Sequence, residues 1–511
     1  MAKIRPPFTW FGRYTNWLVV GGLVIVAAFF RLYELTTLPP GLYTGEAQVG
    51  LDAMRLAHGV LPGFVAANGY APLWTVLQAL SIMALGHTVL ALRVWPAIIG
   101  IGAVVATWLW ARTWFDRRVA LVAAFVVAVT PWAVTLSRNA LPVALIGLLV
   151  PLTLWAATWA YHRGGLKWWL LTLGLGLIDL VSGPLGWLLA LTVAILGTIR
   201  LVQRRQLWPL NRNRLMLGGA VVLGLAGAGY VAGRSWDALR HLPAALGLVS
   251  SPTALADAVV RTLLMFNLHG DDNLRHNFGG EPLLNAFVGL MFIAGLLVTI
   301  SRLAQRRYRV LLVLFAVFLA PAAISLVGLP NAAHAAAVLP VVAVLAAVGV
   351  SYMLELWYAT FPINSAARTT GQAVFIVLLA LTLFQGYTQY FRAWAGSTET
   401  YAAYNEPAVA VAKFVQAEPA KTVFYVVAQS DELPVVAYLN NYLNDESHYI
   451  PLTPGQVAGV PLGGTKQFVI TAAARDEATK SLRLKFPGGK LQPHISTFSQ
   501  DEIYYTYEMT P

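Results

Sequence analysis

The chain has 511 residues, of which 58% are hydrophobic and only 11% are charged. Soluble globular proteins carry roughly 25% charged residues, so this composition excludes a soluble cytosolic, secreted or fibrous protein and predicts a multi-pass membrane protein. The net charge of +12 does not indicate nucleic-acid binding, because residues 1–390 carry +15 and residues 391–511 carry −3, which places the basic excess in the apolar part.

The first apolar segment, residues 17–30, follows Lys3, Arg5 and Arg13. Positive charge beside a membrane span marks its cytoplasmic side, so we expect a cytoplasmic N-terminus. The segment runs into Phe-Phe-Arg and not into the small residues of a cleavage site. We therefore interpret it as a retained membrane anchor and not as a signal peptide.

Ten further apolar segments are candidate spans, which gives eleven in all. They are residues 92–112, 119–136, 143–160, 167–181, 184–200, 215–233, 284–301, 309–328, 335–355 and 372–390. When these spans are threaded through the membrane in alternating directions, every arginine-rich connection lies on the cytoplasmic side, as the positive-inside rule requires. Segment 72–87 has only 16 residues, and we expect a re-entrant or surface-lying helix there.

The same threading puts the first loop, the long loop between residues 234 and 282, and the tail 391–511 on the outer face. The tail is predicted to be a small soluble α/β domain. Its expected strands are 422–427, 467–471 and 502–507, and its expected helices are 433–443 and 476–484. The domain boundaries predicted are therefore 1–390 for the membrane part and 391–511 for the extracytoplasmic part.

The first outer loop offers carboxylates for chemistry. Glu46 stands where a helix begins after Pro39 and Pro40, and Asp52 follows in that helix. A carboxylate at a helix N-terminus is stabilised by the helix dipole, which is the structural interpretation of Glu46. The functional interpretation is a general base at the membrane boundary.

The long outer loop is dense in polar side chains. It contains His269, Asp271, Asp272, Arg275 and His276, together with three asparagines. Such groups can bind a divalent cation or a phosphate. The alternative is a solvated turn that uses Gly, Asp and Asn for backbone reasons.

Three further polar residues lie in or beside apolar segments. Arg138 is expected at the outer end of a span, where it either extends to headgroups or binds a lipid phosphate. His334 follows the outer turn at Pro330-Asn331, and Asp179 lies near the end of a short span. Each is also compatible with a purely structural role at a helix end. Zero cysteines exclude disulfides and thiolate chemistry.

Taken as an ordered set, several short motifs resemble the GT-C class of membrane glycosyltransferases. The resemblance is closest to family 39, which includes protein O-mannosyltransferases and the lipid A aminoarabinose transferase. The motifs are the stretch 38–54 (LPPGLYTGEAQVGLDAM), 68–73 (NGYAPL), 130–132 (TPW) with Ser137-Arg138, and 270–277 (GDDNLRHN). They are distributed over most of the chain.

The resemblance implies a bundle of membrane helices whose first outer loop forms surface-lying helices over an active-site cavity. It implies an enzyme of the plasma (cell inner) membrane that transfers a sugar, with inversion, from a polyprenyl-phosphate donor to a protein, lipid or glycan acceptor on the extracytoplasmic face. Glu46 and Asp52 are the catalytic candidates on this view. Arg138, Arg275, His276 and His334 would bind the donor phosphate, and Asp271, Asp272 and His269 are candidates for a divalent cation.

Two departures from the family pattern keep a second hypothesis open. Gly45 and Ala71 occupy positions where relatives usually carry acids. The chain is therefore either an enzyme or a catalytically degenerate homologue that binds lipid-linked saccharide or scaffolds envelope assembly. A transporter is disfavoured, because the charged residues are expected outside the membrane and no matching pair of broken helices is visible. Near the start of the tail, Trp394, Tyr401, Tyr404 and Asn405 are candidates for stacking on a sugar.

Overall fold

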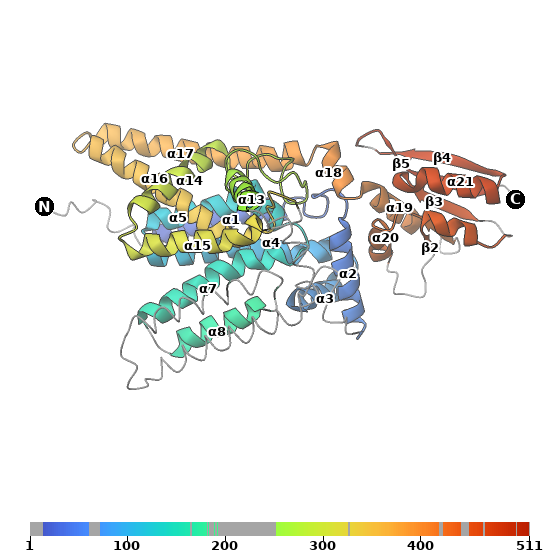
Figure 1. Cartoon of the computed structure of the whole chain (residues 1–511), viewed down its shortest axis with the longest axis horizontal. Helices are drawn as coiled ribbons and strands as arrows, with labels where there is room; N and C mark the ends of the chain where they lie inside the picture. Colours follow the sequence, from blue (N-terminus) through green and yellow to red (C-terminus); the bar gives the residue numbers. More distant parts are fainter. Residues whose placement is uncertain are drawn as a thin grey trace. The chain divides into compact units, whose positions relative to one another are not determined.

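The computed structural model describes residues 14–60, 72–163, 166–180, 182, 189, 192, 252–324, 328–417, 423–440, 449–462, 466–496 and 498–509. These residues form two compact units (Figure 1). Unit 1 takes its residues from 1–33, 96–138 and 142–390, and unit 2 takes its residues from 34–95, 139–141 and 391–511. The predicted spans 184–200 and 215–233 lie almost wholly outside the described residues.

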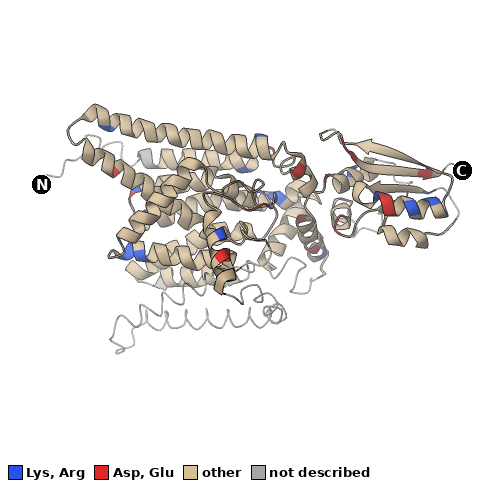
Figure 2. Ribbon diagram, turned by 45° about the horizontal axis from the view of Figure 1, so that its top comes forward, with Lys and Arg blue, Asp and Glu red and all other residues tan. Residues whose placement is uncertain are grey.

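Unit 1 is helical. Its elements are α1 (Tyr14–Leu32), most of α4 (Val89–Trp114), α5 (Arg117–Val129), α6 (Pro131–Leu136), α7 (Val143–Arg163), α8 (Leu166–Leu180), α13 (Pro252–Leu264), α14 (Ala286–Ser301), α15 (Arg306–Ala323), η1 (Ala336–Val338), α16 (Leu339–Thr360), α17 (Ser365–Thr388) and the start of the π-helix η2 (Gln389–Trp394). These helices are mostly uncharged along their lengths (Figure 2). The chain is a multi-pass helical membrane protein.

Four helical segments among the described residues are long and apolar enough to cross a membrane. They are Val89–Trp114, Val143–Arg163, Ala336–Thr360 and Ser365–Trp394. Three shorter apolar helices are Trp17–Leu32, Pro72–Leu85 and Ala286–Ser301. A helix rises about 1.5 Å per residue, so α3 (Pro72–Leu85), with 14 residues, reaches about 21 Å and is too short to cross a hydrocarbon core of about 30 Å.

The predicted continuous span 119–136 is two helices. Thr130 separates α5 from α6 with extended backbone angles, φ −66° and ψ 126°. The residue before a proline is pushed out of the helical region, and Pro131 has no N–H to continue the helical hydrogen bonds. Hydropathy alone does not reveal this break, because both helices are apolar.

Helix α16 forms the centre of unit 1 and packs against α14 and α5. Its apolar side chains are almost entirely buried between Leu339 and Val350. Gly295 of α14 faces the carbonyl of Leu345, and Gly349 faces the carbonyl of Met291. Small residues that let two backbones approach closely are typical of helix pairs in membranes.

Unit 2 combines helices with a mixed sheet. Its elements are α2 (Thr44–Ala57), α3, α18 (Thr398–Ala403), α19 (Glu406–Ala417), β1 (Phe424–Val427), α20 (Leu433–Leu439), β2 (Tyr449–Leu452), η3 (Pro454–Gly459), β3 (Gln467–Thr471), η4 (Ala472–Ala474), α21 (Arg475–Lys485), β4 (Gly489–Ile495) and β5 (Glu502–Met509). The strand order is β2-β1-β3-β5-β4. β1 runs parallel to β2 and β3, whereas β5 is antiparallel to β3 and β4.

Alternating side chains of the sheet enter two apolar cores. Val469 belongs to a core shared with α2, α19 and α20, whereas its neighbours Phe468 and Ile470 belong to a core shared with α21. The three strands expected from the sequence are β1, β3 and β5. The two that the sequence did not predict, β2 and β4, are the edge strands, and each contains a proline, Pro451 and Pro493, which weakens a strand signal.

Candidate functional site

Glu46 is completely buried at the start of α2, in unit 2. Its Oε1 accepts a hydrogen bond from the backbone N–H of Ala140 at 2.8 Å, and its Oε2 accepts one from that of Tyr43 at 3.3 Å. The side chain therefore closes the first turn of α2 and ties it to residues 139–141.

Arg93 completes the surroundings of Glu46. Its Nε lies 3.3 Å from Oε1 and its Nη2 lies 3.0 Å from Oε2, and neither side chain has exposed surface. The same guanidinium donates to the carbonyls of Pro39 and Gly41 at 2.7 and 2.9 Å. Both oxygens of Glu46 are thus occupied by protein donors, and the pair fixes the first outer loop.

Arg93 is not among the site residues predicted from the sequence. Its position could have indicated a role, because an arginine at the start of a long apolar segment needs a nearby partner for its charge. Gly41 shows how tightly the loop is held: its φ is +73°, and an added Cβ would collide with the carbonyl of Tyr404. The carbonyl of Tyr404 also accepts a hydrogen bond from the N–H of Leu42 at 2.9 Å.

Asp52, the second catalytic candidate, differs from Glu46 in its contacts. It is 7% exposed, and its Oδ1 lies 3.0 Å from Nη1 of Arg55. Its Oδ2 is buried and has no hydrogen-bond partner among the described residues. Buried polar atoms are nearly always satisfied, so Oδ2 is able to accept a hydrogen bond from a further group.

The remaining site candidates lie in unit 1. Arg138 is fully buried, its Nη1 donates to the carbonyl of Phe30 at 3.0 Å, and its guanidinium lies 5.4 Å from the ring centre of Tyr390. A second buried arginine, Arg31, was not predicted from the sequence and donates to the carbonyls of Val127 and Ala128 at 2.8 Å each. Together they concentrate two positive charges within the helical unit.

Asp271 and His276 form a pair. Nδ1 of His276 lies 3.2 Å from Oδ2 of Asp271, and the same oxygen accepts from the N–H of Ala332 at 2.8 Å. The other oxygen accepts from the N–H of Asn273 at 2.8 Å. The carboxylate therefore orients the imidazole ring of His276 and joins the long loop to the turn that contains His334.

His334 belongs to the same group. Burial lowers the pKa of His334 first, the neighbouring His276 lowers it further, and Asp271 partly offsets both effects. Its backbone N–H donates to Oδ1 of Asn331 at 2.9 Å. The structure thus brings three of the sequence-predicted residues together, and Arg275 lies one residue away from His276 in the same loop.

The three residues proposed for a divalent cation do not gather. His269 and Asp272 face one another at 3.3 Å, with side chains 65% and 74% exposed, whereas both oxygens of Asp271 are occupied as described. No group of three or more His, Cys, Asp or Glu within the described ranges is placed to hold a metal ion. These three residues therefore do not fit a shared metal site.

A cavity of about 780 Å³ lies within unit 2, a volume typical of ligand pockets. Its walls come from the first outer loop, α19 and the last two strands. They include Thr36, Pro40, Tyr401, Glu406, Lys413, Phe414, Phe498 and Tyr504.

Aromatic rings stack along the wall of this cavity. The rings of Tyr401 and Phe498 are 3.9 Å apart and nearly parallel. Of the four residues expected to stack on a sugar, Tyr401 lines the cavity. Trp394 and Tyr404 are buried against each other, and Asn405 donates to Oγ1 of Thr44 at 2.8 Å.

Part of the chain matches a known protein family. A family described as dolichyl-phosphate-mannose-protein mannosyltransferase matches residues 70–226. No curated protein sequence matches the chain.

Two solved structures are similar over nearly the whole chain. ArnT from Cupriavidus metallidurans, bound to undecaprenyl phosphate, is 13% identical with a TM-score of 0.54, covering 97% of this chain and 99% of that one. The oligosaccharyltransferase AglB from Archaeoglobus fulgidus, solved with an inhibitory peptide and a dolichol-phosphate, is 15% identical with a TM-score of 0.52, covering 98% of this chain and 74% of that one. The chain spans 65% of the length of the Archaeoglobus fulgidus oligosaccharyltransferase in another crystal structure. The protein therefore shares the fold of these membrane enzymes and resembles the family 39 branch of the GT-C class.

Proposed function

We propose that the protein is an integral-membrane glycosyltransferase that moves a sugar from a polyprenyl-phosphate donor to an acceptor on the extracytoplasmic face, with inversion. The observation that carries the proposal is the end-to-end likeness to ArnT, whose structure was solved with undecaprenyl phosphate. The description of the matching family also names a lipid-phosphate sugar, dolichyl-phosphate-mannose. On this proposal residues 1–390 hold the donor in the membrane and residues 391–511 lie outside it.

The donor phosphate is assigned to the cationic groups of unit 1. As the sugar leaves, negative charge develops on the lipid phosphate, and positioned donors stabilise that charge. His276 is held by Asp271 at 3.2 Å, and His334 and Arg275 are its neighbours. The buried Arg138 supplies a further positive charge to the same unit.

The general base is assigned to Asp52. In an inverting transfer the acceptor oxygen attacks the sugar carbon, the bond to the lipid phosphate breaks, and the base accepts the acceptor proton. A base needs a free lone pair, and Oδ2 of Asp52 has no partner among the described residues. Glu46, whose oxygens already accept four hydrogen bonds from Tyr43, Ala140 and Arg93, is assigned to positioning the loop.

A part of the acceptor remote from its reacting hydroxyl is assigned to the cavity of unit 2, because Asp52 does not line that cavity. Stacked rings and polar groups side by side, such as Tyr401 with Glu406 and Lys413, suit a saccharide, which presents apolar ring faces and hydroxyl edges.

The test is a transfer assay with purified protein in lipid and a panel of labelled polyprenyl-phosphate sugars. Asp52→Asn should lower the rate by about 100-fold or more, since the loss of a general base costs that much. Arg55→Gln, which removes the ion-pair partner of Asp52 at 3.0 Å but leaves the carboxylate, is the matched control and should retain most activity. A folded Asp52→Asn protein with more than about a tenth of wild-type activity removes Asp52 as the base.

The second candidate is the catalytically degenerate homologue. It is favoured by the saturated carboxylate of Glu46 and by Gly45, where any side chain would meet the ring of Tyr43. It predicts that labelled donor binds but is never turned over, in wild type as in Asp52→Asn.

A further inference from the structure

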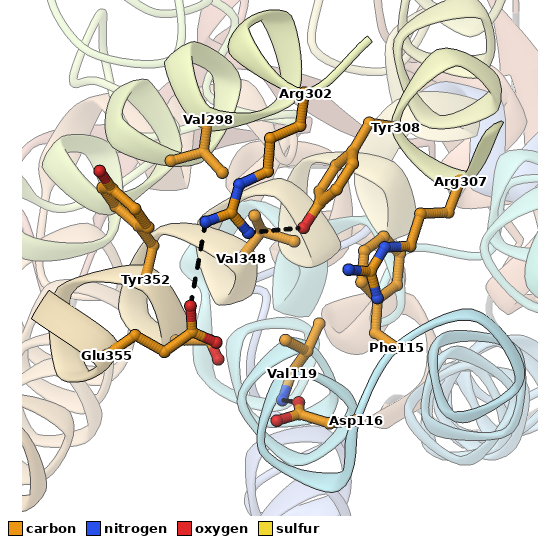
Figure 3. A pocket seen from close by; sticks show the side chains of 11 residues that line it. Phe115, Asp116, Val119, Val298, Arg302, Arg307, Tyr308, Val348, Tyr352 and Glu355 are labelled. Carbon is orange, nitrogen blue, oxygen red and sulfur yellow. Dashed lines mark hydrogen bonds and ion pairs between the residues drawn. The ribbon is translucent and has the colours of Figure 1, made fainter. Parts of the chain in front are cut away.

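A second cavity lies wholly within unit 1, where α5 begins and where α14 and α16 end (Figure 3). Its volume is about 140 Å³, room for about four or five water-sized groups. Helix α16 has 22 residues, about 33 Å in length, and begins beside the turn of His334. The cavity is therefore near the opposite membrane surface from the proposed donor-phosphate site.

The cavity is polar and its charges balance. It is lined by two arginines, Arg302 and Arg307, and by two carboxylates, Asp116 and Glu355. Figure 3 shows Arg302 between Tyr308 and Glu355. Its guanidinium donates to the hydroxyl of Tyr308 at 3.2 Å, and Glu355 lies 4.0 Å away.

The arginines retain donors for a ligand. Arg307 lies over the rings of Phe115 and Tyr308, at 5.5 and 4.8 Å, and forms no hydrogen bond or ion pair with another described residue. Arg302 uses two nitrogens of a group with five N–H donors. Two such guanidiniums, from neighbouring ends of α14 and α15, suit the oxygens of one phosphate.

The acidic side of the cavity suits an ammonium group. Glu355 is 56% exposed and holds Arg302 only at 4.0 Å, so its carboxylate is available to a second cation. The ring of Tyr352 lines the same wall and is already engaged, because the Arg302 guanidinium lies 5.3 Å from its centre. Asp116 is already engaged, because its Oδ1 accepts from the N–H of Val119 at 3.0 Å.

The source of such a ligand is indicated by the surrounding surface. Leu297, Ile300 and Leu303 beside Arg302 are 62%, 48% and 36% exposed, and Leu356 beside Glu355 is 44% exposed. Apolar side chains of this kind on membrane helices face acyl chains, and tyrosines and arginines concentrate at the boundary with the headgroups. A phosphate with an attached amine at this depth belongs to a phospholipid.

We propose that this cavity binds the phosphoethanolamine headgroup of a membrane phospholipid, with the phosphate on Arg302 and Arg307 and the ammonium on Glu355. Phosphatidylglycerol lacks the cation for Glu355. Phosphatidylcholine carries a cation that cannot donate hydrogen bonds. The site should therefore distinguish these three headgroups when the acyl chains are the same.

The test is native mass spectrometry of the delipidated full-length protein, titrated with the three lipids. Phosphatidylethanolamine should bind about tenfold more tightly than either alternative, and Arg302→Ala should weaken it about tenfold, the effect of losing a charged hydrogen bond. Glu355→Gln should abolish the preference over phosphatidylglycerol. Because Glu355 is exposed, this variant should stay folded even where Arg302→Ala does not.

The matched control is Arg118→Ala. Arg118 lies 5.5 Å over the ring of Tyr358 at the same end of unit 1 and does not line the cavity, so its loss should leave lipid binding unchanged. Equal or tighter binding of phosphatidylglycerol would make this a simple anion site and overturn the proposal. Equal effects of Arg302→Ala and Arg118→Ala on lipid binding would also overturn it. So would displacement of the lipid by soluble phosphoethanolamine at the same concentration, because acyl chains would then contribute nothing to binding.

Discussion

The buried ion pair of Glu46 and Arg93 is the residue-scale feature on which the first outer loop depends. A charge removed from water is tolerated only when it is paired and hydrogen-bonded, and here Glu46 also accepts from the N–H of Tyr43 and Arg93 also donates to the carbonyl of Pro39. The sequence identified Glu46 as a candidate but not its partner, because residues 46 and 93 are distant in the chain and only the fold joins them.

Glu46→Gln should destabilise the protein, since removing one member of a buried pair costs about 3–5 kcal/mol. Thermal unfolding in detergent measures this cost. Glu46→Gln combined with Arg93→Met, which removes both charges, should be more stable than Glu46→Gln alone. If the single variant unfolds like wild type and only turnover is lost, Glu46 acts in chemistry and the positioning role is wrong.

His334 should give the protein a pH-dependent response to its donor. Burial lowers the pKa of His334 below its usual value of about 6.5, so the unfolded chain binds more protons and the ligand-free protein loses stability as the pH falls below that value. A bound phosphate favours the protonated ring and opposes this loss.

The measurement is the thermal midpoint of unfolding at about pH 5.5 and about pH 7.5, with and without undecaprenyl phosphate. Histidine side chains titrate within this range. The lipid should stabilise the protein more at the lower pH. His334→Gln should reduce the pH dependence of both states, and an unchanged profile would separate His334 from phosphate binding.

Close packing of α14 on α16 is the decisive feature at the scale of elements. Both crossing glycines face a carbonyl of the opposite helix, so the two backbones meet without intervening side chains. Hydropathy predicted apolar segments in both places, but it carries no information about which of them touch. That pairing is decided by complementary shape along two faces.

Gly349→Ala should separate these helices, because an added Cβ would collide with the backbone carbonyl of Met291. The expected cost is about 1–3 kcal/mol, as for other overpacked sites, measured as a lower thermal midpoint. Gly22→Ala is the matched control, since nothing lies within 4 Å of an added Cβ there. Equal midpoints for the two variants would contradict the close approach.

At the scale of the whole molecule, topology controls which groups can meet a donor. On the orientation that the loop charges predict, every residue assigned to transfer lies on the extracytoplasmic side and the lipid-headgroup cavity lies on the cytoplasmic side. Both placements depend on a single orientation.

Alkaline phosphatase fused after Pro511 should therefore be active, because it folds only outside the cytoplasm, whereas a green fluorescent protein fusion at the same point should be dark. A fusion within the basic connection at residues 302–306 should show the opposite pattern. The reverse result for both would move the proposed catalytic groups to the cytoplasmic side and overturn the assignment of the acceptor.

The sequence by itself determined the class of this protein: apolar runs fix membrane helices, alternating runs fix β1, β3 and β5, and ordered motifs resemble one class of enzyme. These are local properties, and local patterns are sufficient for them. Only the tertiary structure decided that Glu46 is bound by Arg93, that an oxygen of Asp52 has no partner among the described residues, and that Asp271 orients His276 beside His334. Those facts depend on contacts between distant segments, where burial and hydrogen bonding, and not residue type, decide what a side chain can do.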